Sequence, residues 1–409
     1  MTRYGFVMFF CFWSIAATAQ ELTLTPSQIE AMFLKQNLEL IAERMNVSIA
    51  DAAIAEAKVW DNPEFSVNDI NVWSAGREKQ FSVELTQMVA LSDRRTKRTN
   101  VEKVGKEIAI KQFEEVLRGL KAELRASIAE IVFRQNFLKL IENQKKFLEN
   151  VTAGYQTQYE RGNVTRSELL RLQMALFTIE NEINDAQTEL NGLQKTLKNL
   201  LAIDSGAVIV VADDGNSLPL PASLNLPALI ETALAFRPDL QAAILQTDYH
   251  RKDITYQKSL AVPDLNLGIK YDRYGGVWDN FFGIGVGLQI PIFNRNKGAI
   301  KTAQIQLKQS ELLVEQGQKT LQNEIIESYR NYSNTFAFLE RNLKNPALGE
   351  LDQMLEVYAR NLMAKNITMV EYMDFMDSYR STKEIFLKSQ KELKLQFEQL
   401  QFSVGQDIK

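Results

Sequence analysis

The sequence has very few cysteine and histidine residues and no excess of basic charge, and each shortage excludes a class of function. The single cysteine, Cys11, and the single histidine, His250, are too few for a zinc cluster. The formal net charge of -4 argues against a nucleic-acid partner, because binding to phosphates requires a basic surface. Beyond the first residues no apolar run is long enough for a membrane helix, so the chain could cross a membrane only as a β-barrel.

Catalytic constellations are also scarce. A serine-histidine-aspartate triad would have to use His250, which lies in the helical stretch DYHRKDITYQ. The GIGVG segment at 283–287 resembles a phosphate loop only superficially, because more strand and not a helix follows it. We predict that the protein is not an enzyme and has neither a cofactor nor a metal site, and that His250 is structural or solvent-facing.

The first residues have the pattern of a secretory signal peptide. A basic residue precedes an apolar run over 4–15, and Ala17 and Ala19 form an Ala-x-Ala cleavage pattern. A transmembrane anchor fits less well, because the run is shorter than the roughly 20 residues that span a bilayer. We expect residues 1–19 to be removed, so that the mature chain begins at Gln20 and contains no cysteine.

An internal repeat divides the rest of the chain. LTPSQIEAMFLKQNLEL at 24–40 matches LNLPALIETALAFRPDL at 224–240, and the register continues until a proline-acid pair at 63–64 faces one at 263–264. Each copy is expected to contain a helix, two strands and then a very long helical stretch. The sequence therefore predicts a tandem duplication.

The predicted domains follow from this duplication. The first repeat covers 20–203 and the second covers 224–409. Residues 204–223 form a connector, rich in Gly, Asp and Pro, with a strand candidate at 207–211.

The long helical stretches are typical of coiled coils. Over 93–201, apolar residues recur at three- and four-residue spacing among charged and amide side chains. A helix over about 93–159 would be roughly 100 Å long, which exceeds the width of a globular domain. In the second repeat, Pro346 is expected to kink or interrupt the helix that enters the corresponding hairpin.

Two similar motifs break these helices. ERGNVTRSELLRLQ at 160–173 and MAKNITMVEYMDFM at 363–376 share an Asn, a Thr and a Glu at the same spacing. Gly162-Asn163 predicts a hairpin turn, because both residue types tolerate the left-handed conformation that ends a helix. Lys365-Asn366 takes that place in the second motif without a glycine, so the geometry of the second turn stays open.

The strand candidates alternate between apolar and small or polar residues. In DLNLGIKYDRY apolar residues occupy every second position, so they share one face of a strand. In NFFGIGVGLQIPI the apolar residues also share one face, and glycines occupy the other. A buried sheet of a soluble protein would not usually set three glycines against its apolar face, whereas a barrel with lipid outside and water inside would. We therefore predict lipid-facing positions at Phe282, Ile284, Val286, Leu288 and Ile290, and lumen-facing positions at Gly283, Gly285 and Gly287.

Four strands are too few to close a barrel, since about eight are needed, so the protein must form an oligomer. Aromatic residues near the hairpin ends are expected in an interfacial belt: Trp73, Tyr274, Trp278 and Phe281. FSVNDINVW and KQFSVELTQMV complete the strand set less cleanly, because Asp69 and Asn71 disturb the first pattern.

These segments resemble the TolC-like outer membrane efflux family, and within it most of all the branch of heavy-metal and cation efflux factors. The likeness lies in VPDLNLGIKY and GVGLQIPIFNRNKGAI among the strands and in YQTQYERGNVTRSELL and YARNLMAKNITMVEYM at the hairpins, and it covers nearly the whole mature chain. The resemblance implies a mixed α and β fold. Each chain would give four strands to a trimeric 12-stranded transmembrane β-barrel, continued by a long periplasmic α-helical barrel of coiled-coil hairpins.

The resemblance also implies a location and partners. It places a homotrimer in the outer membrane of a Gram-negative bacterium, in contact with lipid and extending into the periplasm. The two turns would dock at the periplasmic mouth onto a periplasmic adaptor (membrane fusion) protein, joined to an inner-membrane pump that we expect to be of the RND type. The leading hypothesis is thus a passive efflux duct. The alternative is a soluble periplasmic coiled-coil scaffold or adaptor, in which the strands form a small sheet domain.

Charged residues near the turns are the candidate site. Glu371, Asp374 and Asp377 recur on one drifting helix face, which by itself is equally typical of a solvated surface. In the family resembled, acidic residues matching Glu371 and Asp374 line the tunnel constriction, and threefold symmetry would make them attract cations. Arg166 and Arg171 are candidates for ion pairs that hold the mouth closed, with unpaired solubility charges as the alternative.

Overall fold

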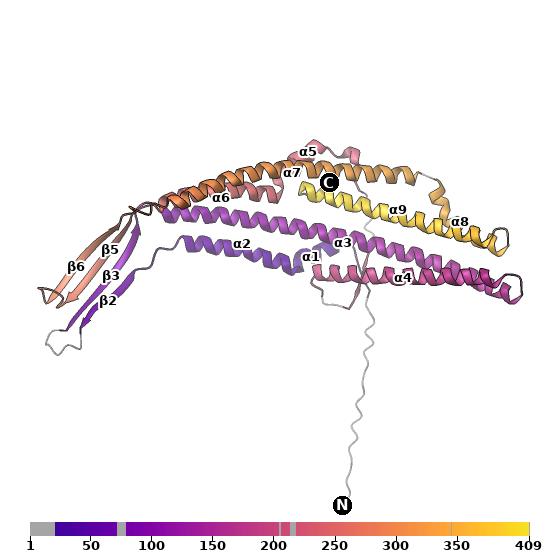
Figure 1. Ribbon diagram of the computed structural model, residues 1–409, viewed down its shortest axis with the longest axis horizontal. Coiled ribbons are helices and arrows are strands. Elements are labelled where there is room, and N and C mark those ends of the chain that lie inside the picture. The colour runs from indigo at the N-terminus through magenta and orange to yellow at the C-terminus, as the bar shows by residue number, and fades with distance from the viewer. Residues whose placement is uncertain (1–20, 72–78, 204–205, 213–217, 345, 409) are drawn as a thin grey trace, which may run out of the picture. The chain divides into compact units, whose positions relative to one another are not determined.

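The computed structural model describes residues 21–71, 79–203, 206–212, 218–344 and 346–408 (Figure 1). The predicted signal peptide, the predicted mature start at Gln20 and the predicted interfacial Trp73 lie outside these ranges.

The chain forms two compact units, and each takes segments from both predicted repeats. We call them the hairpin unit, residues 1–37, 124–217 and 345–391, and the sheet unit, residues 38–123, 218–344 and 392–409. Two helices contribute to both units: α3 (Arg94–Glu160) and α9 (Met369–Val404).

The sheet unit holds the four predicted strands in one antiparallel sheet with the order β2-β3-β5-β6. Their bounds are β2 Glu64–Asn71, β3 Gln80–Ala90, β5 Asp264–Arg273 and β6 Asn280–Gln289. Val67 pairs with Val83, Val83 with Tyr271 and Tyr271 with Phe282. Alternate residues of all four strands therefore share one face, because directly paired residues point to the same side of a sheet.

The first strand carries an irregularity. The register of β2 against β3 shifts between Asn68 and Asn71, and Asp69 there has a left-handed φ of 53°. The Ser82 hydroxyl donates a hydrogen bond of 2.9 Å to the Asp69 carboxylate. This bulge explains physically why the alternation of apolar residues is least regular in that segment.

Helices complete the sheet unit: α2 Leu38–Ala57, α5 Leu226–Phe236, α6 Pro238–Ser259 and α7 Lys297–Leu343, with the short 3₁₀ helix η1 Pro221–Ser223. Tyr332 of α7 is fully buried in their core. Its ring lies 5.4 Å from that of Phe397, and its hydroxyl donates to the Pro219 carbonyl at 2.5 Å. The core therefore joins α7, α9 and the segment before η1 inside one unit.

The hairpin unit contains residues 124–160 of α3 and residues 369–391 of α9. It also contains β1 Glu21–Leu24, α1 Pro26–Gln36, α4 Arg166–Leu200, β4 Val208–Val211 and α8 Pro346–Met363. The predicted strand at 207–211 is confirmed as β4, which pairs in parallel with β1. We did not predict β1, whose four residues are too few to show a period.

The helix predictions are largely confirmed. The first long helix, expected over about 93–159, is α3, Arg94–Glu160. The interruption expected at Pro346 is present, because α7 ends at Leu343 and α8 begins at Pro346. In the described ranges, no helix is long and apolar enough to cross a membrane.

The first helix of each repeat is broken in two at a buried polar residue. Asn37 separates α1 from α2, and its side-chain amide donates to the Leu200 carbonyl at 2.8 Å, near the end of α4. Arg237 separates α5 from α6, and its guanidinium donates to the Ser403 carbonyl at 3.2 Å, near the end of α9. Each repeat thus uses one buried side chain to satisfy a carbonyl that its last helix leaves unpaired.

Candidate functional site

The two hairpin turns have the same backbone geometry. Gly162 has φ 75° and Lys365 has φ 59°, both in the left-handed region. In each turn that residue donates its amide three residues back, at 2.9 and 3.0 Å, and the following asparagine, Asn163 or Asn366, donates its amide five residues back, at 2.9 Å in both. This is the Schellman ending of a helix. The second turn therefore keeps the geometry of the first, although a lysine replaces the glycine.

Side chains strengthen the likeness between the turns. The Asn163 amide group donates to Gln158 at 2.8 Å, and that of Asn366 donates to Asn361 at 3.2 Å. The Lys365 ammonium group also donates to the Asn163 carbonyl at 3.2 Å. Lys365 therefore links the second tip directly to the first within one chain.

A capping box begins the helix after each turn. The Thr165 amide donates to the Glu168 carboxylate at 2.8 Å, and the Glu168 amide donates to the Thr165 hydroxyl at 3.2 Å. Thr368 and Glu371 repeat this exchange at 2.7 and 3.2 Å. Sequence reasoning missed this role of Glu371, although the Thr-x-x-Glu spacing in both motifs was the signal that could have revealed it.

Capping also fixes the charge of both glutamates. The backbone amide of Thr368, followed by its hydroxyl, lowers the pKa of Glu371 below the ordinary value. The amide and hydroxyl of Thr165 lower the pKa of Glu168 in the same way, and the positive charge of Lys365 adds to this effect. Both carboxylates are therefore ionised at neutral pH.

The three acidic candidates on α9 are all exposed within the chain. Asp377 lies 3.5 Å from the Arg380 guanidinium, which also pairs with Glu182 of α4 at 2.7 Å. Asp374 makes no ion pair with another described residue. Glu371 caps α9 and Asp377 pairs with Arg380, so Asp374 is the one of the three with neither a capping bond nor an ion pair among the described residues. Their convergence at a constriction stays a prediction.

The basic candidates are exposed as well. Arg166 is the first residue of α4 and Arg171 lies one turn further, and neither forms an ion pair with another described residue of the same chain. The charge of Arg171 contributes to the lowered pKa of Glu168. Pairing of these arginines that closes the mouth stays a prediction.

A tightly packed core supports the tips. Tyr372, one residue after Glu371, is fully buried, and the rings of Tyr358 and Phe375 stack with centroids 3.9 Å apart. A Cβ atom at Gly154 of α3 would meet the methyl group of the flexible Met363 side chain at the end of α8, which would have to move to admit it. The two hairpins therefore approach each other closely behind their turns.

The sheet has one apolar and one polar face. Phe282, Ile284 and Val286 are 68%, 78% and 68% exposed, and each is paired with a residue of β5 on the same side. The same face carries Phe65, Val67, Leu85, Leu265, Leu267, Ile269 and Leu288, together with the polar residues Gln87, Arg273 and Asn280. The opposite face carries Ser66, Glu84, Thr86, Asn266, Lys270, Gly283, Gly285 and Gly287, together with Met88 and Phe281.

The remaining lipid-facing and interfacial candidates lie at or near the ends of β5 and β6. Ile290 lies just beyond β6 and is 61% exposed. Tyr274 and Trp278 lie in the connection between β5 and β6, where Tyr274 has φ 57°, and Phe281 is in β6 itself. The predicted grouping of these aromatic residues near a hairpin end agrees with these positions, and their contact with a membrane interface stays a prediction.

His250 is half-buried in α6 of the sheet unit. Its Nε2 lies 3.0 Å from the Gln246 side-chain amide, and burial lowers the pKa of the imidazole. Across the ranges that the structure covers, no group of three or more His, Cys, Asp or Glu side chains is arranged to hold a metal ion.

Comparison with known proteins gives a consistent set of similarities. The family model described as outer membrane efflux protein matches residues 229–339. The cobalt-zinc-cadmium resistance protein CzcC of Cupriavidus metallidurans is 22% identical over 273 residues, which cover 65% of this chain and 63% of that relative. The match thus spans less than two thirds of the relative's length.

Solved structures share the fold over almost the whole chain. CusC, whose structures concern transmembrane channel formation, has a TM-score of 0.77 at 16% identity, with 94% of this chain and 92% of that one covered. The CmeC outer membrane channel of Campylobacter jejuni has a TM-score of 0.77 at 12% identity, with 93% and 85% covered. These matches confirm the predicted fold class. In sequence and in fold, the chain is similar to the TolC-like outer membrane efflux proteins, as its motifs predict.

Proposed function

We propose that this protein is the outer membrane channel of a tripartite efflux system, a passive duct for substrates across the periplasm and outer membrane. The observation that carries the proposal is the four-stranded sheet, with large apolar side chains exposed on one face and polar residues and glycines on the other. A sheet that faces lipid outside and water inside needs this division.

The edges of the sheet support a homotrimer. β2 and β6 are the outer strands of the order β2-β3-β5-β6, so each leaves a row of backbone groups without a strand partner in the part of the chain that the structure describes. Membranes do not tolerate such edges, because unsatisfied backbone groups in lipid cost several kcal/mol each. Pairing β6 of one copy with β2 of the next would close three copies into twelve strands.

The paired hairpin tips are the proposed docking surface for a periplasmic adaptor, which would be joined to an inner-membrane pump of the RND type. Both turns present the same geometry and are tied together by Lys365 and Asn163. A rigid, preorganised surface lowers the entropic cost of binding. Gly162, Asn163, Lys365 and Asn366 are the residues at the ends of the tips.

We infer that the cargo includes divalent metal cations. The relative CzcC is named for cobalt, zinc and cadmium resistance. In a trimer, three copies of Asp374 and Asp377 near the pore axis would attract cations and disfavour anions. Glu371 would add to this field while it caps α9, so Asp374 is the cleaner probe of selectivity.

Fractionation of cells that express the full chain tests the proposed function. The duct should remain in the outer membrane fraction, and after mild solubilisation it should migrate on gels as a trimer that heat converts to monomer. Release by osmotic shock as a soluble monomer would instead support a periplasmic scaffold or adaptor.

A further inference from the structure

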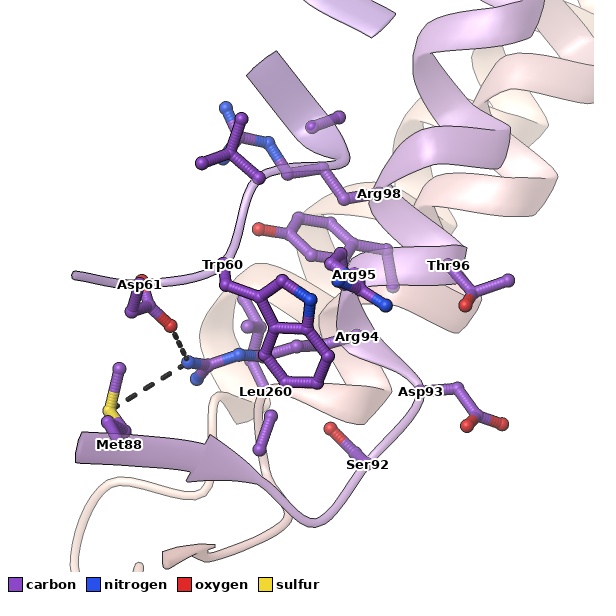
Figure 2. Close-up of a pocket in the computed structure, with 14 residues that line it drawn as sticks. Trp60, Asp61, Met88, Ser92, Asp93, Arg94, Arg95, Thr96, Arg98 and Leu260 are labelled. Atoms are coloured by element: carbon purple, nitrogen blue, oxygen red, sulfur yellow. Dashed lines mark hydrogen bonds and ion pairs between the residues drawn. The ribbon is translucent and has the colours of Figure 1, made fainter. Parts of the chain in front are cut away.

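An open pocket of about 400 Å³ lies in the sheet unit where the strands meet the helices (Figure 2). Its wall combines Trp60 after α2, Ser92 after β3, and the arginines at the start of α3. These arginines belong to the segment DRRTKR at 93–98. Neither the proposed pore nor the hairpin tips use this cluster.

Two of the arginines are already neutralised by carboxylates. Arg94 lies 2.6 Å from Asp264 and 3.1 Å from Asp61. Arg98 lies 2.8 Å from Glu56. These pairs hold the pocket wall together and leave little charge for a ligand.

Arg95 is different. Its guanidinium lies 3.9 Å from the centre of the Trp60 ring and makes one long hydrogen bond, 3.4 Å, to the Lys58 carbonyl. No carboxylate of the described residues forms an ion pair with it, and Asp93 points away from it in Figure 2. The buried Ser92 hydroxyl likewise has no hydrogen-bond partner among the described residues. The pocket therefore offers a cation without a counter-ion and a hydroxyl without a partner.

Exposed apolar side chains occur along the edge of the sheet at which this pocket lies, at the strand-helix junctions. They occur after α2, after β3, before β5 and after β6, so all four strands carry them at the same edge of the sheet. The exposed residues are Val59, Trp60, Leu91, Val262, Ile292 and Phe293. Water would not favour such a ring of apolar groups, whereas a boundary between lipid chains and headgroups would.

We propose that Arg95, Trp60 and Ser92 form a site for the phosphate headgroup of an anionic phospholipid in the periplasmic leaflet. The guanidinium would bind phosphate oxygens, the hydroxyl would donate to one of them, and the indole would lie at the level of the headgroups. This inference rests on the proposed function, because it requires the sheet to lie in a membrane. It goes beyond that function by assigning a lipid class to a particular pocket.

Tryptophan fluorescence in vesicles tests the site. Replacing Trp73 and Trp278 by Phe leaves Trp60 as the only tryptophan in residues 20–409. The full-length trimer is reconstituted in phosphatidylcholine vesicles that contain brominated phosphatidylglycerol or brominated phosphatidylcholine, with bromine near the headgroup end of the chains. Quenching of Trp60 then reports which lipid lies beside it.

The expected result is that phosphatidylglycerol occupies the site about fivefold more readily than phosphatidylcholine, as for one basic side chain near a membrane surface. Arg95→Gln should abolish this preference, and Arg95→Lys, which keeps the charge, should retain part of it. The matched control Lys319→Gln removes an exposed charge about 33 Å along α7 from its start and should leave the preference unchanged.

The outcomes separate this inference from the proposed function. Equal quenching by both lipids, or a preference that survives Arg95→Gln, would overturn the lipid site while leaving the membrane channel intact. Absence of quenching by either lipid would mean that Trp60 is not at a membrane surface, and the lipid site would fail, whereas the fractionation experiment tests the channel independently.

Discussion

Lys365 allows a test of how the second tip is stabilised. Its left-handed conformation costs a non-glycine residue about 1–2 kcal/mol relative to glycine, while glycine makes the unfolded chain more favourable by about 0.4–1 kcal/mol. The exposed bond from its ammonium group to Asn163 contributes about 0.5–1 kcal/mol. Lys365→Gly should therefore be nearly neutral, because relief of strain offsets both losses. Lys365→Ala keeps the strain, loses the bond and should weaken the tip.

Hydrogen exchange at the Asn366 amide measures this directly, because that amide bonds across the turn to the Asn361 carbonyl. Exchange should be about fivefold faster in Lys365→Ala than in Lys365→Gly, which corresponds to about 1 kcal/mol in the free energy of local opening. Gly349→Ala is the control for a glycine-alanine exchange at a position without a left-handed backbone. Gly349 lies inside α8 with open space around it, so alanine there should stabilise the helix. If alanine at 365 protects the turn as well as glycine does, backbone strain does not govern this tip.

Three further predictions concern the sheet, the pore and the caps. Val286→Arg on the exposed apolar face should weaken trimer assembly by about 2–4 kcal/mol if the residue lies near the bilayer midplane, and the yield of trimer on unheated gels measures this. Asp374→Asn should reduce cation preference and block by trivalent cations in planar bilayers without loss of trimer; unchanged selectivity would make it an ordinary surface residue. The lowered pKa of Glu371 implies that its capping contribution is fully present above the ordinary glutamate pKa and is lost as the pH falls through the lower folded value. Exchange at the tip should therefore accelerate in acid relative to Glu371→Gln, and identical acid profiles would show that the carboxylate does not stabilise the cap.

The sequence predicts the long elements of this fold well, because their periods are long and their ends carry strong local signals. Gly162 ends one helix by local backbone chemistry, and Pro346 begins another. The paired turns were also predictable, since the same motif occurs in both repeats. In these places local propensity and tertiary structure agree.

The breaks at Asn37 and Arg237 were not predictable in the same way. Asn37 is satisfied by a carbonyl 163 residues away, and Arg237 by one 166 residues away. Arg237 also pairs with Glu324 at 2.6 Å, so a residue type that is usually solvated lies buried. No local pattern encodes a partner so distant. The capping role of Glu371, in contrast, was readable from its spacing to Thr368.

The most direct test of the central claim is a cysteine scan along β6 in intact outer membranes, since residues 20–409 provide no background thiol. Single cysteines at 282–289 are exposed to a water-soluble maleimide, and trimer formation is checked for each variant. The account predicts labelling at 283, 285 and 287, which face an aqueous lumen, and protection at 284, 286 and 288, which face lipid. Equal labelling of both sets in assembled trimer would contradict a membrane-spanning barrel.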